Sequence, residues 1–162
     1  MSVARSGIGY DSHRFAEGRP LILGGVEIPG AERGLTGHSD ADVLTHALID
    51  ALLGAAGLGD IGQHFPDTDE SYRDADSLAL LAEVCTFLGE HGWNVLHLDA
   101  SVICDAPKLS PHRDEMRSKL AAVVGLQPLQ VNVKFTTNEG LGFIGREEGM
   151  ATLAIATVER AS

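Results

Sequence analysis

Three residues in the first third of the chain, Asp11, His13 and His46, have the side-chain types of a zinc site. Asp11 and His13 are two residues apart at the end of a predicted strand near Tyr10, so both side chains leave one face with Cα atoms roughly 6 to 7 Å apart. On its own, such a pair is more often just two exposed polar residues. His46, on a predicted helix, completes a set of one carboxylate and two imidazoles, which leaves the fourth position of zinc open for a substrate oxygen.

Polar residues surround His46 on the predicted helix. Asp42 lies one turn before it and Asp50 one turn after it, and either carboxylate could fix its tautomer; the sequence does not choose between them. Ser39 is the predicted N-cap of this helix, where free backbone N–H groups favour an anion. Capping explains Ser39 but leaves His38 without a role, so phosphate contact is the competing interpretation.

Further polar residues follow the ends of two later predicted strands. Lys108 comes where a strand ends and a capped helix begins, residues 136–139 follow the next strand, and Arg146 lies in a glycine-rich loop beyond. Taken singly, these are ordinary loop residues. Their shared position at the ends of elements, with glycines that allow close backbone approach, indicates phosphate binding.

The elements that must position these residues mix hairpins with helical crossovers. Gly24 and Gly25 supply the positive φ angles of a two-residue turn in a predicted hairpin, residues 21–28. We predict helices from Ser39 to Gly54 or Gly57, over 75–90 and over 110–125, strands over 95–104, 131–136 and 151–158, and loops over 59–74 and 138–149. This order predicts a single α+β domain over residues 1–162, a mixed sheet with three main helices on one face.

Composition excludes several classes of protein. Of 162 residues 44% are hydrophobic and 22% charged, which suits a globular core and argues against whole-chain disorder. The net charge of −11 argues against nucleic-acid binding. The chain has no apolar run near the roughly 20 residues of a membrane span and no signal-peptide layout, so we expect a cytoplasmic protein with no membrane partner. Cys85 and Cys104 are expected to be reduced core residues.

Six ordered motifs resemble one family, the 2-C-methyl-D-erythritol 2,4-cyclodiphosphate synthases. The resemblance spans residues 7–158 and rests on motifs at 11–13, 37–42 with His46, 59–62, 65–69, 106–108 and 136–146. It implies a homotrimer with active sites between subunits. It also implies a reaction of the non-mevalonate isoprenoid pathway, in which 4-diphosphocytidyl-2-C-methyl-D-erythritol 2-phosphate is cyclised by its own 2-phosphate with release of CMP.

The resemblance also implies roles for individual residues. Asp11, His13 and His46 are the expected Zn²⁺ ligands, Glu139 the expected protein ligand of a Mg²⁺ or Mn²⁺ ion held with substrate phosphates, and His38 and Thr137 the expected catalytic residues. The full set of expected substrate-binding residues is Asp11, His13, His38, Ser39, Asp60, Ile61, Gly62, Phe65, Pro66, Asp67, Thr68, Asp69, Cys104, Asp105, Ala106, Pro107, Lys108, Leu109, Ser110, Thr136, Thr137, Asn138, Glu139, Phe143 and Arg146.

The chain departs from the family pattern at a few positions. Asn138 and Ile144 stand where Thr is common, and Cys104 and Asp105 lie in the expected cytidine segment. Asp105 would suit a phosphate neighbourhood only if its carboxylate faced away. Two other functions fit the same residues: a zinc phosphohydrolase that releases free phosphate, and a non-catalytic module that binds isoprenoid diphosphates.

Overall fold

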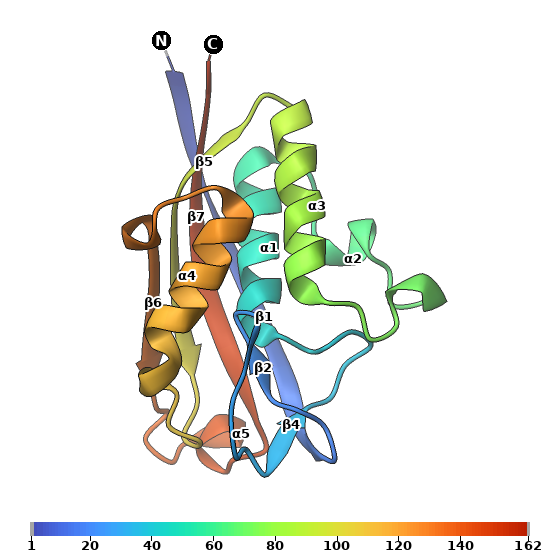
Figure 1. Cartoon of the computed structure of the whole chain (residues 1–162), viewed down its shortest axis with the longest axis vertical. Helices are drawn as coiled ribbons and strands as arrows, with labels where there is room; N and C mark the ends of the chain where they lie inside the picture. The colour runs from blue at the N-terminus through green and yellow to red at the C-terminus, as the bar shows by residue number, and fades with distance from the viewer. Residues whose placement is uncertain (1, 162) are drawn as a thin grey trace.

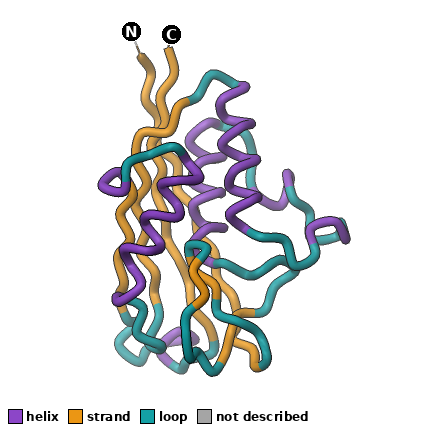
Figure 2. Tube along the Cα trace, viewed as in Figure 1, coloured by secondary structure: helices purple, strands orange, loops and turns teal. Residues whose placement is uncertain are grey.

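A five-stranded mixed sheet forms one layer of the molecule (Figures 1 and 2). The computed structural model describes residues 2–161. The strand order is β4 (Arg33–Leu35), β1 (Ser2–Glu17), β7 (Gly149–Ala161), β5 (Asn94–Ile103) and β6 (Val131–Thr136). The β5–β6 pair is parallel, and the other neighbouring pairs are antiparallel. A two-stranded hairpin, β2 (Ile22–Leu23) and β3 (Val26–Glu27), turns at Gly24 and Gly25, as predicted.

Three helices form the second layer, all on the same face of the sheet (Figure 1). They are α1 (Val43–Ala56), α3 (Ser77–Glu90) and α4 (Arg113–Val124). Alternate residues of β5, Leu98, Ala100 and Val102, are buried under them, as a half-covered strand requires. The predicted α+β architecture, with a mixed sheet and helices packed on one face, is confirmed.

Two glycines in β1 allow α1 to lie unusually close to the sheet. A Cβ atom on Gly7 would come 2.2 Å from the carbonyl oxygen of Ala51, and one on Gly9 would come 1.9 Å from that of Ala47. Any side chain at these positions would push the helix away. Since Gly9 faces α1, residues 11 and 13 of the same strand face it too.

The ends of several elements differ from the sequence predictions. β1 continues past Tyr10 to Glu17 because it pairs with β7 as far as Arg14 and with β4 over residues 15–17, so Asp11 and His13 lie inside a strand. α1 begins at Val43, and its N-cap is Asp42, not Ser39, because the left-handed backbone of Ala41 (φ 57°) interrupts the chain between them.

The two later helices also begin after the predicted residues. α3 starts at Ser77 with Asp76 as its cap, and the Ser110–His112 segment forms a 3₁₀ turn (η2) before α4, without a side-chain cap from Ser110. The predicted loop over 59–74 contains a short helix, α2 (Ile61–His64), and a 3₁₀ turn, η1 (Glu70–Tyr72). The glycine-rich loop contains α5 (Gly142–Gly145), and η3 (Pro128–Gln130) precedes β6. Within residues 2–161, the helices are all too short or too polar to cross a membrane.

The opposite face of the sheet carries exposed apolar side chains. Ile8 on β1 is paired with Ile155 on β7, and Tyr10 is paired with Leu153. The exposed fractions of these four side chains range from 43% for Leu153 to 67% for Ile8. We call this group the open-face patch. Apolar side chains gathered in this way on a sheet face commonly mark an interaction surface.

Candidate active site

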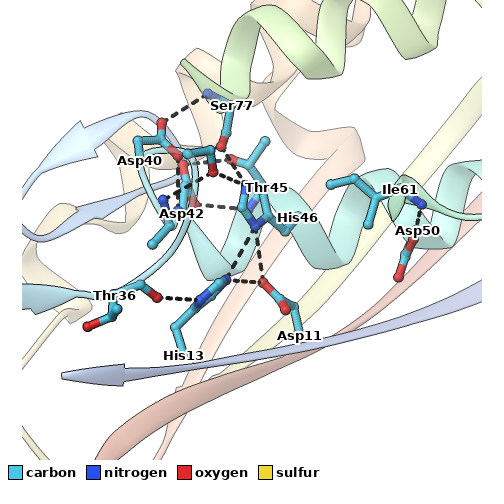
Figure 3. A network of polar contacts seen from close by, with 12 residues as sticks. Asp11, His13, Thr36, Asp40, Asp42, Thr45, His46, Asp50, Ile61 and Ser77 are labelled. Atoms are coloured by element: carbon cyan, nitrogen blue, oxygen red, sulfur yellow. Dashed lines mark hydrogen bonds and ion pairs between the residues drawn. The ribbon is translucent and has the colours of Figure 1, made fainter. Parts of the chain in front are cut away.

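Three predicted ligands converge where β1 passes beneath the start of α1 (Figure 3). Asp11 and His13 project from β1 toward the helix layer, and His46 projects from the first turn of α1 toward the strand. The Asp11 Oδ2 atom lies 2.8 Å from His13 Nε2 and 3.2 Å from His46 Nδ1, and the two imidazole nitrogens are 3.4 Å apart. One carboxylate and two imidazoles therefore meet at a single point.

The size of this triangle suits a tetrahedral metal ion. Ligand atoms bound at zinc distances lie about 3.3–3.6 Å from one another, and the two edges that involve His46 are close to that spacing. The Asp11–His13 edge is shorter and would open slightly around an ion. Three protein ligands leave one tetrahedral position for a substrate oxygen, which is the arrangement of catalytic rather than structural sites.

Backbone and hydroxyl groups orient both imidazole rings through the ring nitrogen that does not face the cluster. His13 Nδ1 donates to the carbonyl oxygen of Thr36 (2.8 Å), which leaves Nε2 free for a metal. His46 Nε2 contacts the hydroxyls of Ser77 (2.8 Å) and Ser39 (3.1 Å). The Ser77 hydroxyl in turn donates to Asp40, as Figure 3 shows.

Neither carboxylate on the helix holds the His46 imidazole. Asp42 accepts hydrogen bonds from the N–H groups of Gly24, Gly25 and Thr45 and from the Thr45 hydroxyl. It thereby caps α1 and ties the β2–β3 hairpin to it. Asp50 accepts from the Ile61 N–H group and positions α2. The alternatives that the sequence left open are both replaced by Ser77, the first residue of α3, whose hydroxyl donates to Asp40 before α1.

The ligands influence each other's protonation. Burial by itself would raise the pKa of Asp11, but hydrogen bonds with His13 and His46 outweigh it and hold the pKa below its ordinary value. Burial by itself would lower the pKa of His13, but the hydrogen bond and charge of Asp11 raise it above its ordinary value. A metal ion needs both groups deprotonated, so it competes with a proton on His13.

A cleft of about 460 Å³ opens beside the three ligands, and we call it the metal cleft. Of the residues expected to bind substrate, it is lined by His13, His38, Ser39, Ile61, Gly62, Phe65, Pro66 and Asp67. Gly37, Tyr72 and Leu80 line it as well and were not predicted. His38 lies five residues before α1, not at its N-terminus, and its Nε2 contacts the Asp69 carbonyl oxygen (3.0 Å).

Other residues predicted from the 59–74 loop do not line the metal cleft. Asp60 accepts from the Gln63 N–H group as the cap of α2, and Asp69 accepts from the Ser71 N–H group as the cap of η1. Thr68 is also outside the lining. The carboxylates at 60 and 69 thus shape the loop, whereas Asp67 lines the cleft together with the apolar residues of the loop.

A second cleft, of about 540 Å³, lies at the carboxyl ends of β5 and β6, and we call it the strand-end cleft. Its predicted lining residues are Cys104, Asp105, Pro107, Lys108, Leu109, Ser110, Thr136, Thr137 and Glu139. Arg113 and Phe135 line it too and were not predicted. Both residues could have been identified from their place in the sequence beside predicted binding residues, since Phe135 directly precedes Thr136 and Arg113 follows the Ser110 turn.

The Asp105 carboxylate, which lines the strand-end cleft, is held by the backbone of the loop after β6. Its two oxygens accept from the N–H groups of Asn138 (2.7 Å) and Gly140 (3.0 Å) and hold the following loop. Glu139, in left-handed backbone (φ 52°), accepts from the Thr137 hydroxyl (3.3 Å). Glu139 therefore lies in a different cleft from Asp11, His13 and His46.

The remaining predicted binding residues lie outside both clefts. Ala106 precedes a cis peptide bond with Pro107, and Asn138 uses its amide to hold the carbonyl oxygen of Leu141. Phe143 lines a smaller hollow with Ser12, His13, Arg14 and Glu148, and Arg146 forms an ion pair with Glu148 (3.3 Å).

The two clefts lie beside different strands, the metal cleft beside β1 and the strand-end cleft beside β6. Ser12, Ala151, Ile103 and Thr136 are cross-strand neighbours in one row, which makes three strand spacings, or about 14 Å, between β1 and the end of β6. His38 and Thr137, the two expected catalytic residues, therefore line different clefts of this chain.

A cluster of one carboxylate and two imidazoles at the rim of a cleft, on an α+β scaffold, is the kind of site that a metal-dependent enzyme uses. Comparison with known proteins gives the family of the chain. It belongs to the YgbB family, whose family model matches residues 4–159.

Named relatives cover nearly the whole chain. A 2-C-methyl-D-erythritol 2,4-cyclodiphosphate synthase of Rubrobacter xylanophilus is 58% identical over 164 residues, which cover 99% of this chain and 98% of the relative. A bifunctional enzyme IspD/IspF of Anaeromyxobacter dehalogenans is 56% identical over 97% of this chain, and the chain spans only 40% of that protein. Among solved structures, the IspF CDP complex of Plasmodium falciparum superimposes with a TM-score of 0.84 at 30% identity, covering 98% of this chain and 97% of that one.

Proposed function

We propose that this chain converts 4-diphosphocytidyl-2-C-methyl-D-erythritol 2-phosphate to 2-C-methyl-D-erythritol 2,4-cyclodiphosphate and CMP. The observation that carries the proposal is the cluster of Asp11, His13 and His46 at the rim of the metal cleft, in a chain of the YgbB family. In the reaction an oxygen of the 2-phosphate bonds to the β-phosphorus, and the bond from that phosphorus to the oxygen of CMP breaks. The nucleophile belongs to the substrate.

The state of the cysteines agrees with a substrate nucleophile. Burial raises the pKa of both Cys85 and Cys104 to about 11, so each stays a thiol at neutral pH. Catalysis then consists of folding the substrate back on itself and stabilising charge on the transferred phosphoryl group. A bound divalent ion supplies Lewis acidity for that purpose: Zn²⁺ at Asp11, His13 and His46, and Mg²⁺ or Mn²⁺ at Glu139 together with substrate phosphates.

Each cleft has its own part of the substrate in this proposal. The metal cleft takes the methylerythritol unit against Ile61, Phe65 and Pro66, with His38 and Ser39 donating to the phosphates. The strand-end cleft takes cytidine and its phosphate, with Lys108 supplying positive charge and Thr137 a hydroxyl donor. Asp60, Thr68, Asp69, Ala106, Asn138, Phe143 and Arg146 act through backbone groups or at the edges of these clefts.

We further propose a homotrimer in which the metal cleft of one copy meets the strand-end cleft of the next. Two observations support it. The two clefts lie beside β1 and β6, which stand about 14 Å apart in one chain, and the open-face patch leaves four apolar side chains exposed. Association through that face would bury the patch and bring half-sites from two copies together. Because the substrate is a nucleotide derivative, we place the enzyme in the cytoplasm.

Purified protein with the cytidyl diphosphate substrate and Mg²⁺ tests the proposed reaction. We expect one CMP for each cyclic diphosphate formed, measured by chromatography and ³¹P spectra. Release of inorganic phosphate without CMP would instead identify a zinc phosphohydrolase, and tight binding without turnover would identify a binding module.

His46→Ala tests the metal cluster in the same assay. We expect loss of bound zinc, about one ion per chain in the unchanged protein, together with loss of CMP release, because two ligands hold zinc poorly. His91→Ala is the matched control, since His91 caps the end of α3 and, over residues 2–161, its imidazole has a hydrogen bond with the Phe87 carbonyl oxygen and with no other group. Full zinc occupancy in His46→Ala would remove His46 from the site.

A further inference from the structure

One buried hydroxyl group in the middle of the sheet has no hydrogen-bond partner. Thr152 on β7 is completely buried, and among residues 2–161 its Oγ1 atom is the only buried side-chain oxygen or nitrogen without a partner. Buried hydroxyls are normally paired, because an unpaired one has given up its bonds to water and gained nothing in exchange. The Thr152 hydroxyl therefore lowers the stability of the fold unless another state of the protein uses it.

The neighbours of Thr152 on its face of the sheet are apolar with one exception. On β7 itself, the buried side chains of Met150 and Ala154 point the same way, two residues to either side. On the adjacent strands, Thr152 is paired directly with Val102 of β5 and with Asp11 of β1. Directly paired residues have Cβ atoms about 4.5–5.5 Å apart, so the Asp11 carboxylate is within reach of the unpaired hydroxyl.

The Asp11 carboxylate has one oxygen engaged and the other free. Its Oδ2 atom lies 2.8 Å from His13 Nε2 and 3.2 Å from His46 Nδ1, whereas its Oδ1 atom has no hydrogen bond or ion pair over residues 2–161. Two ligand atoms of one zinc ion lie about 3.3–3.6 Å apart, so the Asp11–His13 edge must lengthen when an ion enters. A donor to Oδ1 would hold the carboxylate with Oδ2 toward that ion.

We infer that Thr152 is a positioning residue of the metal site, whose hydroxyl donates to Oδ1 of Asp11 when Oδ2 binds the ion. This inference rests on the proposed function, since it needs a metal ion at Asp11, His13 and His46. A hydroxyl that is unpaired in the metal-free fold and paired in the loaded one contributes to metal affinity and not to folding. Carboxylates that bind metals are commonly held by such a second hydrogen bond, and losing it lowers the affinity about 10- to 100-fold.

Thr152→Val and Thr152→Ser separate the hydroxyl from the shape of the side chain. Valine keeps the shape without the hydroxyl, and serine keeps the hydroxyl without the methyl group. Competition with a coloured chelator measures zinc affinity, which we expect to fall about tenfold in Thr152→Val and less than about threefold in Thr152→Ser.

Urea unfolding of the metal-free protein should rank the same two variants in the opposite order. Thr152→Val should keep or raise the unfolding midpoint, because the metal-free fold loses no hydrogen bond. Thr152→Ser should lower it, because the missing methyl group leaves a cavity. A purely structural role for Thr152 would instead move zinc affinity and stability together.

Thr157→Val is the matched control on the same strand. Thr157 lies an odd number of residues from Thr152, so it faces the other side of the sheet, where its hydroxyl contacts that of Ser6 (3.1 Å). The same substitution there should leave zinc affinity unchanged.

Three results, in a protein that binds zinc and releases CMP, would overturn this inference alone. Unchanged zinc affinity in Thr152→Val would show that the hydroxyl does not support Asp11. Equal weakening in Thr152→Val and Thr152→Ser would assign the effect to packing, and equal weakening in Thr157→Val would assign it to β7 in general. An unchanged protein that binds no zinc would refute the proposed metal site, and the inference with it.

Discussion

The Ser77 hydroxyl stands between His46, a proposed metal ligand, and Asp40, whose carboxylate lies outside the cluster of Asp11, His13 and His46. It contacts His46 Nε2 and donates to Asp40, and Asp40 also accepts from the Ser77 N–H group (2.9 Å). This arrangement keeps a proton on Nε2 and leaves Nδ1 for the ion. The orientation of His46, which lies on α1, therefore depends on Ser77, the first residue of α3.

Ser77→Ala is therefore expected to weaken zinc binding about tenfold without removing a ligand. Competition with a coloured chelator measures the change, and Ser118→Ala, at an exposed position on α4, is the control. Equal zinc affinity in the two variants would mean that packing alone orients His46.

The raised pKa of His13 gives zinc binding a defined pH dependence. In the metal-free protein the proton on His13 stabilises the fold at low pH, and this contribution is lost as the pH rises through a value above the ordinary 6.5. Zinc requires the neutral ring, so its affinity should rise across the same interval. Chelator titrations from pH 6 upward should show this rise, and a zinc affinity independent of pH there would contradict the Asp11–His13 coupling.

The closeness of β1 and α1 places His46 over Asp11 and His13. Gly9→Ala would put a methyl group 1.9 Å from the Ala47 carbonyl oxygen, so the helix must move outward. We expect a loss of about 3 kcal/mol in the free energy of unfolding, measured by urea denaturation, together with weaker zinc binding. In Gly54→Ala the nearest atom to the new methyl group is 3.7 Å away, and this control should gain about 0.5–1 kcal/mol in a helix interior.

If Gly9→Ala kept the stability and the zinc affinity of the unchanged protein, the close packing of α1 on β1 would not be what places the ligands. A variant that loses stability but keeps full zinc affinity would show that the ligands follow the helix as it shifts.

Periodicity in the sequence predicted most elements because packing sets their pattern. The alternation at Leu98, Ala100 and Val102 identified β5, and the residues of α1 matched a helix buried against a sheet. Polar residues hid the true length of β1, since Asp11 and His13 resemble the start of a loop until the pairing with β7 is known. Capping rules placed the start of α1 at Ser39 because nothing in the sequence reveals the left-handed backbone of Ala41.

The site was predictable where ligands carry distinctive chemistry and less so where function depends on packing. Asp11, His13 and His46 were identified from residue type and spacing. The support that His46 receives from Ser77 was missed, because it crosses from α1 to α3 and depends on the angle between the two helices. Arg113 and Phe135 were missed for the same reason: only the packing of α4 on β6 turns them toward a cleft.

The molecule as a whole presents two clefts and an exposed apolar face, and the proposed trimer relates these features. If each catalytic centre is completed by a neighbouring copy, breaking the assembly should abolish turnover but leave zinc binding intact, since one chain supplies Asp11, His13 and His46. The open-face patch offers a direct way to separate these properties, because its four residues lie on the side of the sheet opposite α1.

Ile8→Glu places a charge at the most exposed position of the open-face patch, beside Ile155. Burying that charge without a partner would cost several kcal/mol, so we expect monomers in sedimentation equilibrium, zinc at the level of the unchanged protein, and CMP release reduced about a hundredfold or more. Leu129→Glu is the matched control: Leu129 is 87% exposed on η3, away from the patch, and its variant should remain trimeric and active. A monomeric unchanged protein, or an active monomer of Ile8→Glu, would show that a single chain completes the site by itself.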